Sequence, residues 1–279
     1  MDQPSVDSTD SETPPFEGEL VPLPYLSADE AVEGREDPFV LVVQNALEFC
    51  RWTVAEAPGL QWIQAENLLG EPEVWATAAR KGNGVALDVI VSDPATEYSA
   101  IYRLVDLRVV RDVRVTIPVL PGFLKALRLA ASIQVPVRLL PGTITSGNIA
   151  ELKEAADYFL HDPSVEVPVE FFHSLFGFAR GLNAPDLWIV TESDPDIFES
   201  PLASGGPRFV ERHMETLDAD EAECVKCRWR DFCRGYFKHP DPSFPCDGIK
   251  SVFSVIGDAA DEMGRDLAGF GDGESPEGV

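Results

Sequence analysis

Four of the five cysteines of this 279-residue chain fall between positions 224 and 246, and this cluster constrains the fold more than any other feature of the sequence. The four are Cys224, Cys227, Cys233 and Cys246, whereas Cys50 stands alone in the first half. The sequence starts with neither a basic segment nor an apolar run, so no secretory signal is indicated and a cytoplasmic location is expected. Because thiols stay reduced in the cytoplasm, the cluster indicates a metal site rather than paired disulfides.

The spacing of the cysteines leaves two kinds of metal centre open. A structural zinc site usually takes two knuckles, each of which offers two thiolates from one tight turn. Here only Cys224 and Cys227 form such a C-x2-C knuckle, and Cys233 and Cys246 come singly. That arrangement favours a [4Fe–4S] cluster, which takes its thiolates from several directions. Zinc in a structural adaptor protein is the alternative.

Aromatic and basic residues interleave the cysteines. The aromatic rings would shield a cluster from water, and the cations would stabilise its negative charge. Solvation of a turn, or an acidic partner, would account for the cations equally well. The aromatic residues are Trp229, Phe232, Tyr236, Phe237 and Phe244, and the basic residues are Lys226, Arg228, Arg230, Arg234 and Lys238.

The pattern C-x2-C-x5-C-x-G-Tyr-Phe-Lys, followed by Asp241-Pro-Ser-Phe-Pro-Cys246-Asp and a helix-like tail, resembles the SPASM domain. This is the auxiliary-cluster module at the C-terminus of many radical-SAM peptide-modifying enzymes, where it holds two [4Fe–4S] clusters. The resemblance implies that Cys224, Cys227, Cys233 and Cys246 ligate one cluster. Phe237 occupies the place of a cysteine of the other cluster, whose upstream cysteines are also missing. A reduced version with one cluster is therefore expected.

The resemblance fails at the motif that radical-SAM enzymes use for catalysis. Those enzymes hold their reactive cluster with C-x3-C-x2-C, and Cys50 is the only cysteine in the corresponding half of this chain. We therefore expect no catalysis by the chain alone, and no catalytic residue is assigned. Cys50 is predicted to be a small buried apolar residue. The expected partners are a complete radical-SAM enzyme and its peptide substrate, for which this chain would relay electrons or bind the substrate.

Strand-like and helix-like runs alternate between positions 39 and 190, which is typical of a parallel sheet covered by helices. About five strands cannot close the eight-stranded barrel of the (β/α)8 fold, so the prediction is an α/β fold with a partial, open parallel β/α barrel. A capping box led by Asn148 is predicted to open one of the helices. Strands are predicted at 39–43, 85–91, 113–119, 135–140, 165–171 and 187–190, and helices at 73–81, 122–132 and 148–160.

Composition divides the chain into four parts. Residues 1–37 are acidic and poor in apolar anchors, so they are predicted to be a disordered tail, and residues 269–279 form a second one. The partial barrel is predicted at 38–205 and the small SPASM-like iron–sulfur domain at 206–268. This is enough chain for one substantial core with a small appended module.

Charge and hydropathy exclude several classes of function. The chain carries 48 acidic against 22 basic residues, a net charge of -26, which opposes binding to the phosphate backbone of nucleic acids. No apolar run approaches the ~20 residues that cross a bilayer, so no membrane association is expected. The common nucleotide, hydrolase and metalloprotease motifs are missing. The scattered histidines receive no assignment, although His173 follows a predicted strand, and an undetected enzyme site in the α/β part stays open.

Overall fold

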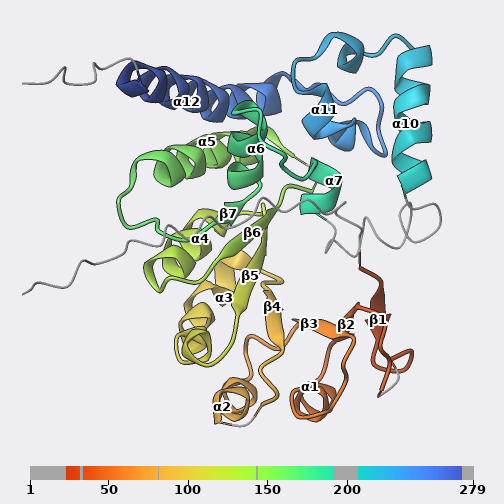
Figure 1. Cartoon of the computed structure of the whole chain (residues 1–279), viewed down its shortest axis with the longest axis vertical. Helices are drawn as coiled ribbons and strands as arrows, with labels where there is room; N and C mark the ends of the chain where they lie inside the picture. Colours follow the sequence, from red (N-terminus) through yellow and green to blue (C-terminus); the bar gives the residue numbers. More distant parts are fainter. Residues whose placement is uncertain (1–22, 32–33, 81, 143, 192–206, 272–279) are drawn as a thin grey trace, which may run out of the picture.

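Seven parallel strands, hydrogen-bonded to one another in chain order, form one curved sheet (Figure 1). The computed structural model describes residues 23–31, 34–80, 82–142, 144–191 and 207–271. Within these ranges β1 and β7 are the two edges of the sheet, so the predicted partial, open parallel β/α barrel is confirmed. The strands are β1 (Tyr25–Ser27), β2 (Phe39–Val43), β3 (Leu60–Ala65), β4 (Ala86–Ile90), β5 (Val113–Pro118), β6 (Val137–Leu140) and β7 (Val169–Glu170).

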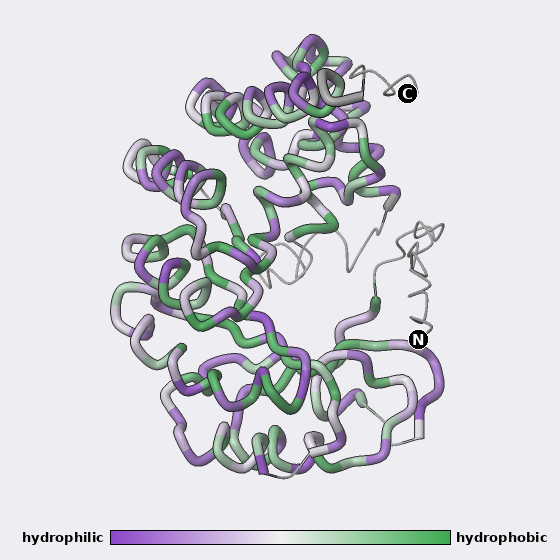
Figure 2. The backbone as a smooth tube through the Cα atoms, turned by 60° about the vertical axis from the view of Figure 1, so that its left-hand side comes forward, coloured by the Kyte–Doolittle hydropathy of each residue, from purple (hydrophilic) through white to green (hydrophobic). Residues whose placement is uncertain are grey.

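Helices cover the convex side of the sheet, and the last helices lie beyond β7 (Figure 1). Hydrophobic and hydrophilic residues alternate along these covering helices, as Figure 2 shows. The helices that follow β2 to β6 are α1 (Ala46–Trp52), α2 (Pro72–Arg80), α3 (Pro94–Glu97), η1 (Tyr98–Leu104), η2 (Leu107–Val109), α4 (Phe123–Ser132) and α5 (Ser146–His161). Those after β7 are α6 (Phe172–Ala179), α7 (Leu187–Val190), α10 (Pro207–Ala219), η4 (Glu223–Lys226), α11 (Arg230–Cys233), η5 (Tyr236–Lys238) and α12 (Asp247–Gly271).

The two faces of the sheet differ in polarity. Leu87 and Val89 of β4 are fully buried among other apolar side chains of the core, whereas Asp88 between them points to the concave face. Its register partner on β5 is Arg114, and on the next pair of strands Arg138 lies opposite Glu170. Each of β4 to β7 thus places one charged side chain on the concave face.

Most of the sequence-predicted elements of the sheet are confirmed. The predicted strands at 39–43, 85–91, 113–119 and 135–140 correspond to β2, β4, β5 and β6. The run 165–171 shortens to β7, and β3 was not predicted. The prediction of a strand at 187–190 is wrong: these residues form α7, because the Asp186 side chain accepts a hydrogen bond from the Ile189 amide and caps a helical turn.

Three further expectations about boundaries differ from the structure. Helix α5 begins at Ser146 with Thr145 as its cap, whose hydroxyl accepts from the Asn148 amide, so Asn148 lies inside the helix. Residues 25–27 were expected in the acidic tail, yet they form β1, because their backbone pairs in parallel with β2. Residues 1–22 and the predicted boundary between 205 and 206 lie outside the described residues. At the other end, α12 continues to 271, into the predicted second tail.

Helix α12 joins the cysteine-rich segment to the barrel. It packs against α5 and α6, and a Cβ on its Gly248 would stand 3.0 Å from a side-chain carbon of Ile149 on α5. The Phe253 ring of α12 lies 6.1 Å from the Phe171 ring beside β7 and 5.6 Å from the Trp229 ring of the cysteine-rich segment. The two predicted domains therefore share one hydrophobic core. Within the described ranges, no helix combines the length and apolar composition that a bilayer crossing requires.

Two glycines of α12 offer a matched test of this packing. A Cβ at Gly257 would stand 2.5 Å from the Trp229 ring, while nothing lies within 4 Å of a Cβ at Gly264. We expect Gly257→Ala to lower the free energy of unfolding by about 1–3 kcal/mol through overpacking. Gly264→Ala should raise it by up to about 1 kcal/mol through helix propensity. Urea unfolding followed by tryptophan fluorescence measures both, and equal effects would contradict the close approach of Trp229 to α12.

Candidate functional site

The four clustered cysteines line one small cavity of about 20 Å³. Cys224 comes from η4, Cys227 directly follows η4, Cys233 ends α11, and Cys246 directly precedes α12. The cavity is completed mainly by side chains of the cysteine-rich segment and of the first turns of α12. These include Trp229, Arg230, Ile249, Lys250 and Phe253. The structure thus brings together all four residues predicted as metal ligands, from three separate turns of the backbone.

Tight local turns set the positions of the thiols. The Cys227 amide donates to the Cys224 carbonyl at 3.1 Å, which forms the knuckle, and the Cys233 amide donates to the Trp229 carbonyl at 2.8 Å. After Cys233 the chain reverses at Gly235, whose φ of 74° is in the left-handed region. A Cβ at Gly235 would stand 2.6 Å from Leu217 of α10, so only glycine fits this turn without displacement.

Burial keeps the thiols of Cys224, Cys233 and Cys246 protonated at neutral pH when no metal is bound. It raises the pKa of Cys233 to about 12 and that of Cys246 to about 12, and it also raises the pKa of Cys224. Thiolates, not thiols, ligate metals, so metal binding here must release protons. The described cysteines form no disulfide. Among the described residues, no three His, Cys, Asp or Glu side chains lie close enough together to hold a single metal ion.

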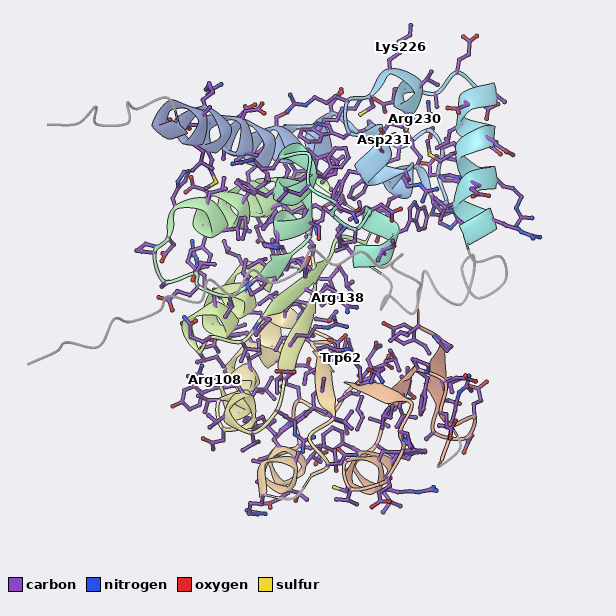
Figure 3. All side chains as sticks on the ribbon, viewed as in Figure 1. Trp62, Arg108, Arg138, Lys226, Arg230 and Asp231 are labelled. Carbon is purple, nitrogen blue, oxygen red and sulfur yellow. The ribbon has the colours of Figure 1, made fainter. Side chains whose placement is uncertain are left out.

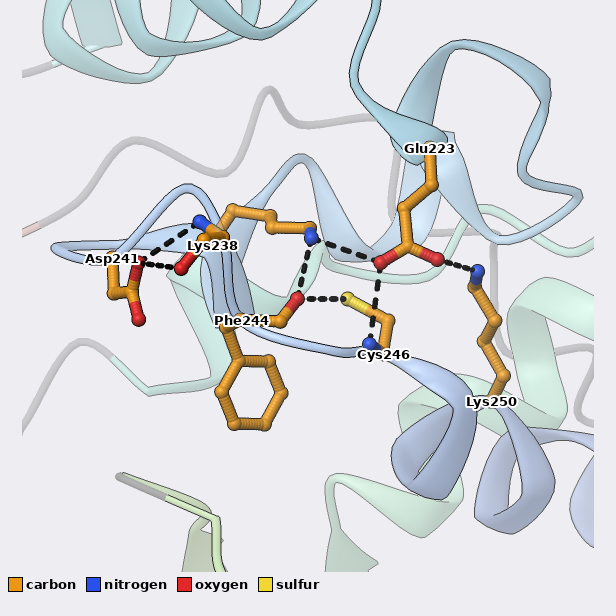
Figure 4. Close-up of polar contacts among 7 residues, drawn as sticks. Glu223, Lys238, Asp241, Phe244, Cys246 and Lys250 are labelled. Atoms are coloured by element: carbon orange, nitrogen blue, oxygen red, sulfur yellow. Dashed lines mark hydrogen bonds and ion pairs between the residues drawn. The ribbon is translucent and has the colours of Figure 1, made fainter.

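The Glu223 carboxylate bonds to three groups beside the cavity, as Figure 4 shows. Its Oε1 accepts from the Cys246 amide at 3.2 Å and lies 2.9 Å from Lys238 Nζ, while its Oε2 pairs with Lys250. Burial alone would raise the pKa of Glu223, but the hydrogen bonds from Lys238, Lys250 and the Cys246 amide lower it to about 2. Because the folded-state pKa is lowered, this carboxylate stabilises the fold above its ordinary pKa of 4.5, and the contribution is lost as the pH falls towards 2.

Two ammonium groups face the sulfur atoms. The Lys238 side chain is only 6% exposed, and its Nζ also donates to the Phe244 carbonyl. Burial would lower the pKa of Lys238, but Glu223 and the nearby Cys246 and Cys224 raise it above its ordinary value. The pKa of Lys250 is raised mainly by its hydrogen bond to Glu223. Both lysines are therefore charged at neutral pH, beside the sulfur atoms that a metal would ionise.

The other cations of this segment are mostly neutralised by carboxylates outside the cavity. Arg234 lies 2.8 Å from Asp186 before α7, and Arg230 pairs with Asp218 of α10. Arg228 stacks over the Trp229 ring and lies 3.9 Å from Asp258 of α12. Lys226 points outward, away from the rest of the chain (Figure 3). The basic segment therefore serves mainly to attach the cysteine-rich turns to neighbouring helices.

The remaining candidates from the sequence lie apart from this cavity. Cys50 is on α1, partly buried against the core, and lines no part of the cysteine cavity. His213 accompanies His239 in a ring cluster around Trp188, whose indole N–H donates to the Arg234 carbonyl at 2.9 Å. Burial, and then the neighbouring His213, lowers the pKa of His239. His173 is exposed and lines a second, larger cavity on the concave face of the sheet.

Sequence reasoning missed two features of the chain. One is Glu223, whose contacts depend on lysines 15 and 27 residues away and follow from no local spacing. The other is the set of charged residues on the concave face. A usable signal for that set exists, because each of the strands β4 to β7 carries one charged residue in an apolar run. The four are Asp88, Arg114, Arg138 and Glu170.

Comparisons of the chain with known protein families, with curated proteins and with solved structures give no match. The chemistry of the site follows from four soft thiols, which are the groups able to ligate a metal, with two ammonium groups and one carboxylate beside them. Thiols of this kind suit iron–sulfur clusters and zinc.

Removal of the Glu223 charge should destabilise the cavity. Glu223→Gln leaves the nearly buried Lys238 ammonium without its counter-ion, so we expect a loss of about 1–3 kcal/mol in the free energy of unfolding at pH 7. Asp258→Asn is the matched control, because Asp258 and Arg228 form an exposed pair at 3.9 Å and should contribute less than about 0.5 kcal/mol. Urea unfolding at pH 7 compares the two variants. Similar values for both would show that Glu223 does not hold the cavity together.

Proposed function

We propose that this chain is an iron–sulfur protein that holds one [4Fe–4S] cluster on Cys224, Cys227, Cys233 and Cys246. The observation that carries this proposal is that all four thiols border the same cavity. Three separate turns supply them, which suits the thiolate geometry of a four-iron centre. We also propose a cytoplasmic location, where these thiols would stay reduced until the cluster is loaded.

The surroundings of the cavity fit an anionic cluster. Trp229 and Phe253 exclude water from its walls, and the charges of Lys238 and Lys250 offset the negative charge of four thiolates. At about 20 Å³ the cavity has room for a single water molecule. Binding of a [4Fe–4S] cluster therefore requires the cysteine side chains to move apart. Cys227 and Cys233 are partly exposed residues, whereas Cys224 and Cys246 are buried.

A [4Fe–4S] cluster with four thiolate ligands supplies one-electron transfer and has no iron open to a substrate. Together with the resemblance to SPASM domains, this supports a role as a non-classical radical-SAM relative that relays electrons or binds the substrate. The proposed partners are a complete radical-SAM enzyme and the peptide or small substrate that it modifies. No residue of this chain is assigned a catalytic role in that reaction.

Anaerobic reconstitution of the full chain with iron and sulfide tests the cluster. We expect about four irons and four sulfides per chain, with a broad brown absorbance, because four ligands complete one cubane. Cys224→Ala should lose most of the iron and colour. Cys50→Ala is the matched control and should keep both, because Cys50 lies on α1, away from the cavity.

The alternative is a zinc-binding structural adaptor. Stoichiometric zinc with no bound sulfide, lost in Cys224→Ala and retained in Cys50→Ala, would establish this alternative and overturn the iron–sulfur proposal. Metal analysis of the chain purified without oxygen distinguishes the two before any reconstitution. Equal content of the bound metal, iron or zinc, in Cys224→Ala and Cys50→Ala would reject both kinds of centre at these four thiols.

The partner role is tested separately. Coexpression with a complete radical-SAM enzyme should give a complex that survives size-exclusion chromatography when the cluster is loaded. The Cys224→Ala chain should elute apart from the enzyme if the loaded cavity orders the contact surface. Failure of the wild-type chain to bind that enzyme, while its iron content is complete, would leave the cluster in place and reject the partner.

A further inference from the structure

A polar band crosses the concave face of the sheet. Asp88 is fully buried there and accepts from Thr116 Oγ1 at 2.6 Å and from Arg114 Nη2 at 2.8 Å. The Arg114 guanidinium also lies over the Trp62 ring, 4.3 Å from its centre, so its position is fixed on two sides. Arg138 follows on β6, and Figure 3 shows Trp62 and Arg138 on the side of the sheet opposite α3 and α4. Interiors of closed parallel barrels are filled by packed apolar layers, so this face is unusually polar.

A cavity of about 430 Å³ opens on this band, between the strands β5 to β7 and the helices α6 and α7. Its volume lies within the range of small-molecule sites, which are mostly apolar with a few placed polar groups. Polar groups from the strands, from α6 and from the loop after it line one part of the cavity, and apolar groups from that loop and from α7 line the rest. The polar lining is Arg114, Arg138, Glu170, His173, Ser174 and Asn183, and the apolar lining includes Leu182, Ala184, Pro185, Ile189 and Val190.

Arg138 has hydrogen-bonding capacity that the chain does not use. The residue is only 7% exposed, and its Nη2 lies 3.6 Å from Asp88, whose carboxylate already accepts from Arg114 and Thr116. Among the described residues, the Nη1 of Arg138 has no hydrogen-bond partner. A buried donor without an acceptor costs free energy, and a guanidinium matches a carboxylate in shape and charge. Arg138 lines the cavity, so a ligand carboxylate there would supply the missing acceptor once the guanidinium turns its buried Nη1 towards the cavity.

Glu170 adds a second requirement. It is the register partner of Arg138, one strand further along the sheet, and its carboxylate accepts from Ser174 Oγ at 2.7 Å. A negative group this close to the guanidinium disfavours a polyanion such as phosphate and favours a cation on the same ligand. The net charge of -26 acts in the same direction. A carboxylate and an ammonium group a few bonds apart would satisfy both residues.

We propose that this cavity binds an α-amino acid group, with its carboxylate on Arg138, its ammonium on Glu170 and an apolar side chain against α7. The carboxylate and the ammonium belong either to a free amino acid or to the two ends of one short peptide. Both kinds of ligand carry the same two charges. Leu182, Pro185 and Ile189 offer the apolar surface for the side chain. The site is separate from the cysteine cavity, since the two cavities have no lining residue in common.

Isothermal titration of the full chain with three matched ligands tests the proposal. We expect one molecule of L-leucine to bind per chain. N-acetyl-L-leucine lacks the ammonium group and L-leucinamide lacks the carboxylate, so each should bind at least tenfold more weakly. L-leucyl-L-leucine distinguishes the sources, because tighter binding than L-leucine assigns the site to peptide ends. No binding of either zwitterion, or equal binding of all the leucine derivatives, would overturn the proposal.

Variants of the chain then test which side chain binds the carboxylate of the ligand and which binds its ammonium. Arg138→Gln should weaken L-leucine binding about tenfold, and Glu170→Gln should weaken L-leucine but leave N-acetyl-L-leucine unchanged. Glu170→Gln keeps an oxygen for Ser174, so its fold should persist even if Arg138→Gln unfolds, which circular dichroism checks. Arg128→Gln is the control, because Arg128 pairs with Glu154 on the outer helices, and it should bind L-leucine like the wild type. An unchanged L-leucine affinity in Glu170→Gln would contradict the assigned orientation.

Discussion

The packing of α12 on α5 and α6 is the contact on which the rest of the arrangement depends. Cys246 stands at the foot of this helix, and Ile249, Lys250 and Phe253 of its first turns form one wall of the cysteine cavity. The same helix meets α5 through Gly248, where the absence of a side chain allows the close approach. The position of the fourth thiol is thus set by the barrel rather than by the cysteine-rich turns alone. The cavity is consequently a product of the whole core, not of a detachable module.

The open sheet explains why the concave face tolerates charge. In a closed barrel, eight strands surround an interior that must be filled with apolar side chains, and an arginine there would lose its hydration without compensation. Here seven strands leave one side without a strand within the described residues, so Arg114 keeps partial access to water and Arg138 borders a cavity. The Asp88 carboxylate offsets the positive charge of the Arg114 and Arg138 guanidinium groups. The polar band is therefore a feature that the incomplete barrel permits.

The sequence predicts those parts of the chain in which one pattern decides the structure. Apolar runs rich in valine predict β4, β5 and β6 well, since strands buried in a parallel sheet need little else. The clustered cysteines predict which four side chains line the small cavity. The run Leu-Trp-Ile-Val at 187–190 misleads, because four apolar residues fit a buried strand or a buried helical turn equally, and Asp186 decides for the helix. Glu223 and Arg138 act through residues distant in sequence, so their roles appear only once the strands and turns are assembled.

Helix α7 borders the sheet cavity and also contacts the cysteine-rich segment, although it is four residues long. Ile189 and Val190 face the sheet cavity, while the indole of Trp188 donates to the Arg234 carbonyl, one residue after Cys233. Asp186, at the start of the helix, holds the Arg234 guanidinium as well. A shift of this helix cannot be confined to one side. If an occupant of the sheet cavity favoured one position of α7, it would also act on the backbone beside Cys233, and linkage would make that influence equal in both directions.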